Sequence, residues 1–149
     1  KGIANFELTK NRMQIQKAKI GATIINDCYN ANYDSMKAAL NYLGKLTNPR
    51  KIAVLGDMKE LGEYSKKLHE QVGEEVYQNK IDLLICVGEE AKAIAKKAQE
   101  LGMKQEDIFV CNQKEEAIQI LQKNLQKEDA VLVKASNSCK FIEICEAIC

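Results

Sequence analysis

Residues 24–36 of this 149-residue chain read IINDCYNANYDSM, and they join two different patterns. Ile24 and Ile25 are typical of the end of a buried strand, whereas Met36 begins a helical spacing of apolar residues that continues at positions 39, 40, 43 and 46. A cluster of Asp and Asn side chains lies between the two. The stretch predicts a strand, a polar turn and a helix, and in parallel sheets such turns lie at the strand ends where ligands bind.

Two interpretations of this polar turn are open. Asn32 or Asp34 can cap the helix, because Asn and Asp side chains commonly accept hydrogen bonds from the first helical N–H groups. Capping alone does not account for Asp27, Tyr29 and Asn30 in the same turn. The second interpretation is therefore a candidate binding site.

Strand and helix patterns alternate along the rest of the chain. Apolar runs at 51–55, 83–87, 108–111 and 130–133 predict short strands, and a helical spacing of apolar residues follows each of them. Residues 12–16 alternate like a strand and lie close to the strand that begins at about residue 22, which predicts an antiparallel hairpin. The expected class is α/β, with an open, mostly parallel sheet, helices on both faces and an N-terminal antiparallel hairpin.

The predicted helices carry their own start signals. Ser65 is the expected cap of a helix that buries Leu68 and Val72, and Asn112 with Glu115 fits a capping-box variant. His69 is the single histidine, and it lies beside the buried face of the first of these helices. Because the sequence supplies no orienting carboxylate and nucleophile for it, a structural or edge-of-site role is expected.

Composition narrows the class of protein. With 46% apolar and 29% charged residues, the chain resembles one soluble globular domain. A net charge of +1 argues against a nucleic-acid partner, because nucleic-acid-binding proteins usually have a strong basic excess. No apolar run approaches the roughly 18 residues that a membrane-spanning helix needs. The first residue is Lys1 rather than Met, and no signal-peptide pattern follows it, so the sequence looks like an excised or processed piece of something longer. Its six cysteines lack Cys-x-x-Cys spacing and are expected mostly to be buried in a reducing cytoplasm.

Two further positions are candidates on chemical grounds. Asp57 follows Gly56 at the end of a predicted strand, where it either forms part of a site or bonds its own turn. Arg12 is one of only two arginines among 22 basic residues. A planar guanidinium in a lysine background suggests a phosphate contact, although the spacing alone favours an exposed charge at a strand end.

Three ordered motifs carry a resemblance to a known family. Residues 26–36, NDCYNANYDSM, resemble the DDSYNANPDSM signature that opens the C-terminal domain of Mur ligases. VLGDMKELG at 54–62 and VLVKASNS at 131–138 resemble motifs of the member that joins D-alanyl-D-alanine to UDP-N-acetylmuramoyl tripeptide. The resemblance implies one Rossmann-like C-terminal domain over residues 1–149, from a bacterial cytoplasmic enzyme of peptidoglycan precursor synthesis.

The resemblance assigns one set of residues to ATP. Arg12 would contact the γ-phosphate, and Asp27 would accept hydrogen bonds from the ribose hydroxyls. Tyr29, Asn30 and Asn32 would line the nucleotide side of the same turn.

A second set is assigned to the amino substrate. Asp57 and Met58 lie in the loop that recognises the incoming amino acid in related ligases, and Lys134, Ser136 and Asn137 lie in the matching loop after the last strand. Lys134 would balance the negative charge of the dipeptide carboxylate. The resemblance makes Arg12 and Lys134 the expected catalytic residues.

The chain departs from the family pattern at several positions. Asn26, Cys28 and Tyr33 stand where the family has Asp, Ser and Pro. Ala135 and Asn137 replace the Gly and Arg of a common Lys-Gly-Ser-Arg run. The second change removes a cationic donor, which puts carboxylate binding by this loop in question.

The sequence has neither a Gly-x-Gly-x-x-Gly run nor a P-loop. The resemblance implies that the P-loop, and most of the Mg²⁺ ligands, belong to a central ATPase domain absent from this chain, as is the N-terminal UDP-sugar domain. These domains are the expected partners, and the isolated chain is expected to be inactive. Two alternatives are open: a different Mur-type or folate-type amino acid ligase, and a free-standing α/β binding module.

Overall fold

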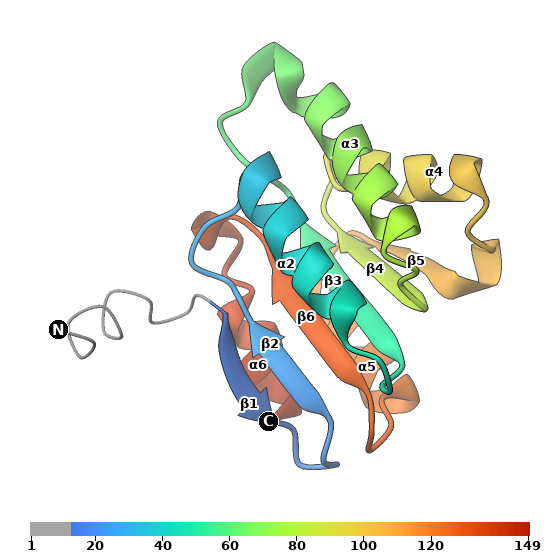
Figure 1. Cartoon of the computed structure of the whole chain (residues 1–149). Helices are drawn as coiled ribbons and strands as arrows, with labels where there is room; N and C mark the ends of the chain where they lie inside the picture. The colour runs from blue at the N-terminus through green and yellow to red at the C-terminus, as the bar shows by residue number, and fades with distance from the viewer. Residues whose placement is uncertain (1–12) are drawn as a thin grey trace, which may run out of the picture.

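The structure is a computed structural model that describes residues 13–149 (Figure 1). The strands are β1 (Gln14–Lys17), β2 (Thr23–Asn26), β3 (Lys51–Gly56), β4 (Leu83–Val87), β5 (Ile108–Cys111) and β6 (Ala130–Lys134). The α-helices are α2 (Tyr33–Lys45), α3 (Ser65–Gln78), α4 (Lys92–Leu101), α5 (Lys114–Asn124) and α6 (Ile142–Ile148). Short 3₁₀ turns occupy η1 (Gly62–Tyr64), η2 (Gln105–Asp107) and η3 (Asn137–Cys139).

The six strands form one sheet in the order β1-β2-β6-β3-β4-β5. β1 is antiparallel to β2, and the other neighbours are parallel. The last strand, β6, lies between β2 and β3 and therefore brings residues from the end of the chain beside its first turn. The expected α/β fold with an N-terminal hairpin is confirmed.

Helices cover both faces of the sheet (Figure 1). Met36, Val72 and Ile94 bring α2, α3 and α4 into one apolar cluster, and Leu121 and Ile144 bring α5 and α6 into the other. β3, β4 and β6 are buried almost throughout because they are covered on both sides, as parallel strands require. Each face of the sheet thus has its own apolar core.

Several local expectations need correction. Glu116, not Glu115, closes the capping box of α5, because its Oε1 accepts from the backbone N–H groups of Asn112 (2.6 Å) and Gln113 (3.1 Å). Ser65 is the first residue of α3 rather than its cap, since the chain enters through η1. His69 lies within the buried face, with no exposed area, and not beside it.

Other sequence expectations are confirmed. Gly102 ends α4 with φ +130°, a conformation that favours glycine. The free cysteines are mostly buried: Cys28, Cys86, Cys111 and Cys145. Between residues 13 and 149 no helix has both the length and the apolar character to cross a membrane. The predicted strand at 12–16 is observed at Gln14–Lys17, and its first residue lies outside the described part.

Candidate functional site

The carboxyl ends of the parallel strands bring distant loops together. Asn26 pairs with Val133, so the next residues of β2 and β6, Asp27 and Lys134, are neighbours although far apart in sequence. β3 lies on the other side of β6, and its last residue, Gly56, leads directly into Asp57. Two polar clusters result at one edge of the sheet.

The first group, the Asp27 cluster, consists of Asp27, Asn30 and Lys134. The Lys134 Nζ lies 2.9 Å from Asp27 Oδ2 and donates to the backbone carbonyl of Asn30 at 2.8 Å. The two side chains of the ion pair are almost completely buried, at 1% exposure for Lys134 and 8% for Asp27, whereas Asn30 is exposed. A buried ammonium requires such pairing because desolvation without it is expensive.

A hollow of about 360 Å³ adjoins the Asp27 cluster. Asp27, Asn30, Asn32 and Lys134 line it from the turn and β6, and Met13 lines it from the entry to β1. Arg12 lies outside the described residues, directly before Met13. The hollow therefore combines carboxylate, amide and ammonium groups that can bind a polar ligand.

The helix-capping interpretation of the turn is confirmed for Asn32. Its Oδ1 accepts from Ser35 N–H at 2.8 Å, and Ser35 Oγ accepts from Asn32 N–H at 3.0 Å, which completes a capping box. The Asn30 Oδ1 accepts from Ala31 N–H at 2.8 Å. Tyr29 is exposed and is not among the residues that line the hollow. Asn30 and Asn32 thus shape the turn and also border the hollow.

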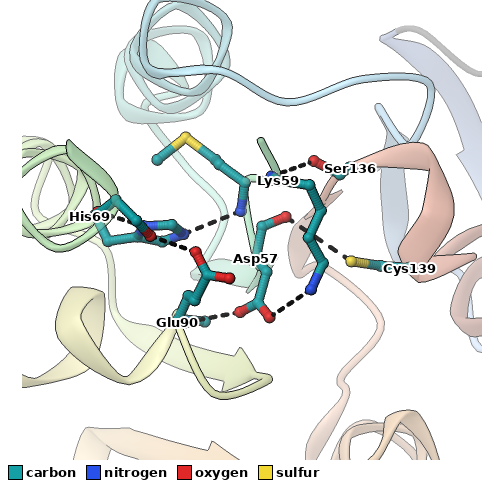
Figure 2. Close-up of polar contacts among 9 residues, drawn as sticks. Asp57, Lys59, His69, Glu90, Ser136 and Cys139 are labelled. Atoms are coloured by element: carbon teal, nitrogen blue, oxygen red, sulfur yellow. Dashed lines mark hydrogen bonds and ion pairs between the residues drawn. The ribbon is translucent and has the colours of Figure 1, made fainter. Parts of the chain in front are cut away.

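The second group, the Asp57 cluster, consists of Asp57, Lys59, His69, Ser136 and Cys139 (Figure 2). Asp57 Oδ1 accepts from the Ala91 N–H at 2.7 Å, and Oδ2 lies 3.3 Å from the Lys59 Nζ. The Asp57 carbonyl accepts from Ser136 N–H at 3.1 Å, which joins the loop after β3 to the loop after β6. Both carboxylate oxygens of Asp57 are therefore engaged.

Gly88 makes the contact between Asp57 and α4 sterically possible. A Cβ at this position would lie 2.6 Å from Asp57 Oδ1, and the backbone has φ +116°. Only glycine combines this conformation with such a close approach. The sequence requirement for Gly88 is thus a consequence of the Asp57 carboxylate beside it.

Met58 lies in the loop after β3, but its side chain is not exposed there. It is completely buried in the apolar cluster that α2, α3 and α4 share, so only the Met58 backbone is at the loop. The Met58 N–H donates to the Nε2 of His69 at 3.0 Å, and the opposite ring nitrogen, Nδ1, lies 2.7 Å from the Ser65 carbonyl. These partners require a neutral ring with its proton on Nδ1. His69 therefore supports the loop structurally, as the sequence suggested.

Ser136 and Lys134 are adjacent in the chain but belong to different clusters. Ser136 Oγ accepts from the Lys59 N–H at 2.9 Å, which places it with Asp57. The Lys134 ammonium instead pairs with Asp27, and Asn137 is exposed at the start of η3. The structure thus brings Asp57, Ser136 and the backbone of Met58 together, whereas the Lys134 ammonium lies with the nucleotide set.

Sequence reasoning missed Lys59 and Glu90. Lys59 belongs to the 54–62 motif, and its charge two residues after Asp57 was the available signal. Glu90 accepts a hydrogen bond from the Ser65 hydroxyl, and no motif marks it. Within the described residues, no three His, Cys, Asp or Glu side chains form a metal-binding group.

The surroundings of the Asp57 cluster shift the pKa values of Lys59 and Cys139. Burial lowers the pKa of Lys59, but its hydrogen bond to Asp57 and the charge of that carboxylate raise it by more, so the net shift is upward. Burial, together with the charge of Asp57, raises the pKa of the Cys139 thiol. Lys59 therefore stays cationic and Cys139 stays a neutral thiol at neutral pH.

Replacement of His69 by Phe is expected to destabilise the chain by about 1–3 kcal/mol, because the buried Met58 N–H would lose its acceptor. Urea unfolding followed by circular dichroism measures the change. Lys67→Ala, an exposed position on the same helix, serves as the control. Equal unfolding midpoints for the two variants would show that the ring nitrogen contributes nothing.

Comparison with known proteins places the chain in a family. The family described as Mur ligase, glutamate ligase domain, matches residues 11–137. The UDP-N-acetylmuramoyl-tripeptide–D-alanyl-D-alanine ligase of Bacillus subtilis is 34% identical over 97% of this chain and 32% of its own length. The ligase of the same name from Escherichia coli K12 is 39% identical over 63% of this chain and 21% of its own length.

Solved structures agree with this assignment. The MurF ligase of Thermotoga maritima, in complex with ADP, has a TM-score of 0.77 and 29% identity over 93% of this chain and 30% of that one. A MurF structure from Acinetobacter baumannii has a TM-score of 0.78 and 25% identity over the same shares. This chain spans about a third of the length of the curated relatives it matches. It belongs to the Mur ligase family, as a glutamate ligase domain.

Proposed function

We propose that the chain, over residues 1–149, is the C-terminal domain of an ATP-dependent ligase that adds D-alanyl-D-alanine to UDP-N-acetylmuramoyl tripeptide in the bacterial cytoplasm. The observation that carries the proposal is the pair of clusters at one edge of the sheet, each built from a motif of that ligase. The relatives with this name, and the ADP-bound neighbour, support the same substrates. The partner domains would be the ligase's own N-terminal and central domains.

The hollow at the Asp27 cluster fits the ribose of ATP. Asp27 Oδ2 is paired with Lys134, whereas Oδ1 has no donor between residues 13 and 149 and can accept from a hydroxyl. Lys134 and the turn fix the carboxylate in place, so binding the ribose requires little reordering. Tyr29, Asn30 and Asn32 would line the nucleotide, and Arg12 would contact its γ-phosphate. Mg²⁺ would be held mainly by the central domain and would neutralise phosphate charge there.

The reaction forms the amide through an acyl phosphate. An oxygen of the tripeptide's terminal carboxylate attacks the γ-phosphorus, and ADP leaves. The dipeptide amine then attacks the acyl carbon, and the resulting tetrahedral adduct loses inorganic phosphate and a proton. This domain would contribute Arg12 at the transferring phosphate, and it would exclude water when it closes over the substrates.

The Asp57 cluster would bind the dipeptide. Asp57 and Ser136 join the loops after β3 and β6, and Met58 fixes the first loop to the core through its buried side chain. Two loops tied in this way can hold the amine in a fixed direction, which lowers the entropic part of the barrier. Asn137, exposed beside them, would complete the binding surface.

Phosphate release from ATP tests the proposal. The chain joined to its native upstream sequence should release phosphate when both UDP-N-acetylmuramoyl tripeptide and D-alanyl-D-alanine are present, and much less when either is omitted. The chain alone should release none. Release that ignores the dipeptide would favour a different ligase, and no release by the longer protein would favour a binding module.

A further inference from the structure

The carboxylate of the dipeptide needs a partner in the site, an inference that rests on the proposed function. D-alanyl-D-alanine reacts at its amine, so its own carboxylate stays free and needs a cationic or hydrogen-bonding partner in the closed site. Asn137, at the start of η3, is exposed but carries no charge. The Lys134 ammonium is 1% exposed and already holds Asp27 and the Asn30 carbonyl. Neither residue offers an accessible cation.

Lys59 is the cation that the structure places at the junction of the two loops. Its backbone N–H donates to Ser136 Oγ at 2.9 Å, which fixes its main chain against the loop after β6. Its ammonium lies 3.3 Å from Asp57 Oδ2, beside Cys139 at the end of η3 (Figure 2). The Lys59 side chain remains 44% exposed, so a ligand can reach it.

The geometry leaves part of the ammonium free. A lysine ammonium has three donors, and among the residues from 13 onward the one acceptor for Lys59 is Asp57. Asp57 itself is nearly buried, and its other oxygen is held by the Ala91 N–H. Asp57 thus fixes the direction of Lys59 while two N–H groups remain for a second carboxylate.

We propose that Lys59 binds the free carboxylate of the incoming dipeptide. Asp57 is then a positioning residue that holds the ammonium in place. This contact would favour, as the incoming substrate, an amine that also has a free carboxylate.

The first test compares Lys59→Met with a matched control in the ligase that includes the native upstream sequence. A lost charge-assisted hydrogen bond should raise the KM for D-alanyl-D-alanine about tenfold to hundredfold, with kcat at saturating dipeptide nearly unchanged. Lys92→Met is the control, because Lys92 is similarly exposed (45%) and pairs with Glu89 at 3.0 Å. Lys59→Arg should restore most of the affinity.

The second test uses the substrate analogue D-alanyl-D-alaninamide, which lacks the carboxylate. The wild-type ligase should prefer the acid over the amide by about tenfold or more, and Lys59→Met should lose that preference. This ratio does not depend on how much of the variant is folded. An unchanged preference in Lys59→Met, or an equal loss in Lys92→Met, would overturn the assignment. If instead the proposed function were wrong, the wild-type ligase itself would show no dipeptide-dependent phosphate release. That result differs from a failure of the Lys59 assignment alone.

Discussion

Replacement of Asp27 by Ala should lower the free energy of unfolding of this chain by about 3–5 kcal/mol. The reason is the Lys134 ammonium, which is 1% exposed and lies 2.9 Å from the Asp27 carboxylate. Without that carboxylate, the ammonium retains one acceptor, the Asn30 carbonyl at 2.8 Å, and no countercharge within the described structure. Urea unfolding followed by circular dichroism measures the loss.

A double-mutant cycle separates the interaction energy of the Asp27–Lys134 ion pair from the effect of lost side-chain volume. Lys134→Met keeps most of the side-chain volume and removes the charge. In the double variant Asp27→Ala/Lys134→Met, no buried charge is left unpaired, so the destabilisation should be smaller than the sum of the single effects by at least about 1 kcal/mol. Strict additivity would mean that the two groups do not stabilise one another.

Replacement of Arg12 by Ala should lower kcat of the ligase about 10²–10³-fold, the size expected when one donor to a developing anion is removed. The proposed contact is with the γ-phosphate, where the guanidinium would offset charge as phosphate moves to the tripeptide carboxylate. Stability should change much less than turnover. The measurement is steady-state phosphate release with both substrates saturating, together with the melting temperature.

Arg50 is the natural control because it is the chain's one other arginine. It pairs with Asp129 at 2.7 Å and donates to the Asn124 carbonyl, so its role is to join β3 and α5 to the start of β6. Arg50→Ala should therefore destabilise the fold while turnover per folded molecule stays near the wild-type value. Undiminished phosphate release by Arg12→Ala would remove that residue from the mechanism.

Most of the fold could be predicted from the sequence because its signals are local. The apolar spacing from Met36 and the cap at Asn32 predict α2, and the apolar run at 83–87 predicts a strand buried on both faces. Strands of this kind, separated by helices, leave few arrangements other than a mostly parallel sheet. The starts of the helices were predicted less well, as at Glu116, where side-chain hydrogen bonding decides between adjacent residues.

The site was harder to predict because it depends on strand order. Lys134 could reach the loop of either neighbouring strand, and only the register of β6 between β2 and β3 places its ammonium on Asp27. Met58 shows a second limit, since a residue in a polar loop can still insert its side chain into the core. Neither outcome follows from periodicity, because both depend on contacts between segments distant in the chain.

The mass of the reaction product shows which amine the ligase joins to the tripeptide. The chain joined to its native upstream sequence is incubated with ATP, Mg²⁺, UDP-N-acetylmuramoyl tripeptide and an equimolar mixture of D-alanyl-D-alanine, D-glutamate and L-lysine. We expect one new UDP-linked species, heavier than the tripeptide by one dipeptide less water, formed with one phosphate per product. A product carrying a single amino acid instead, or no product, would contradict it.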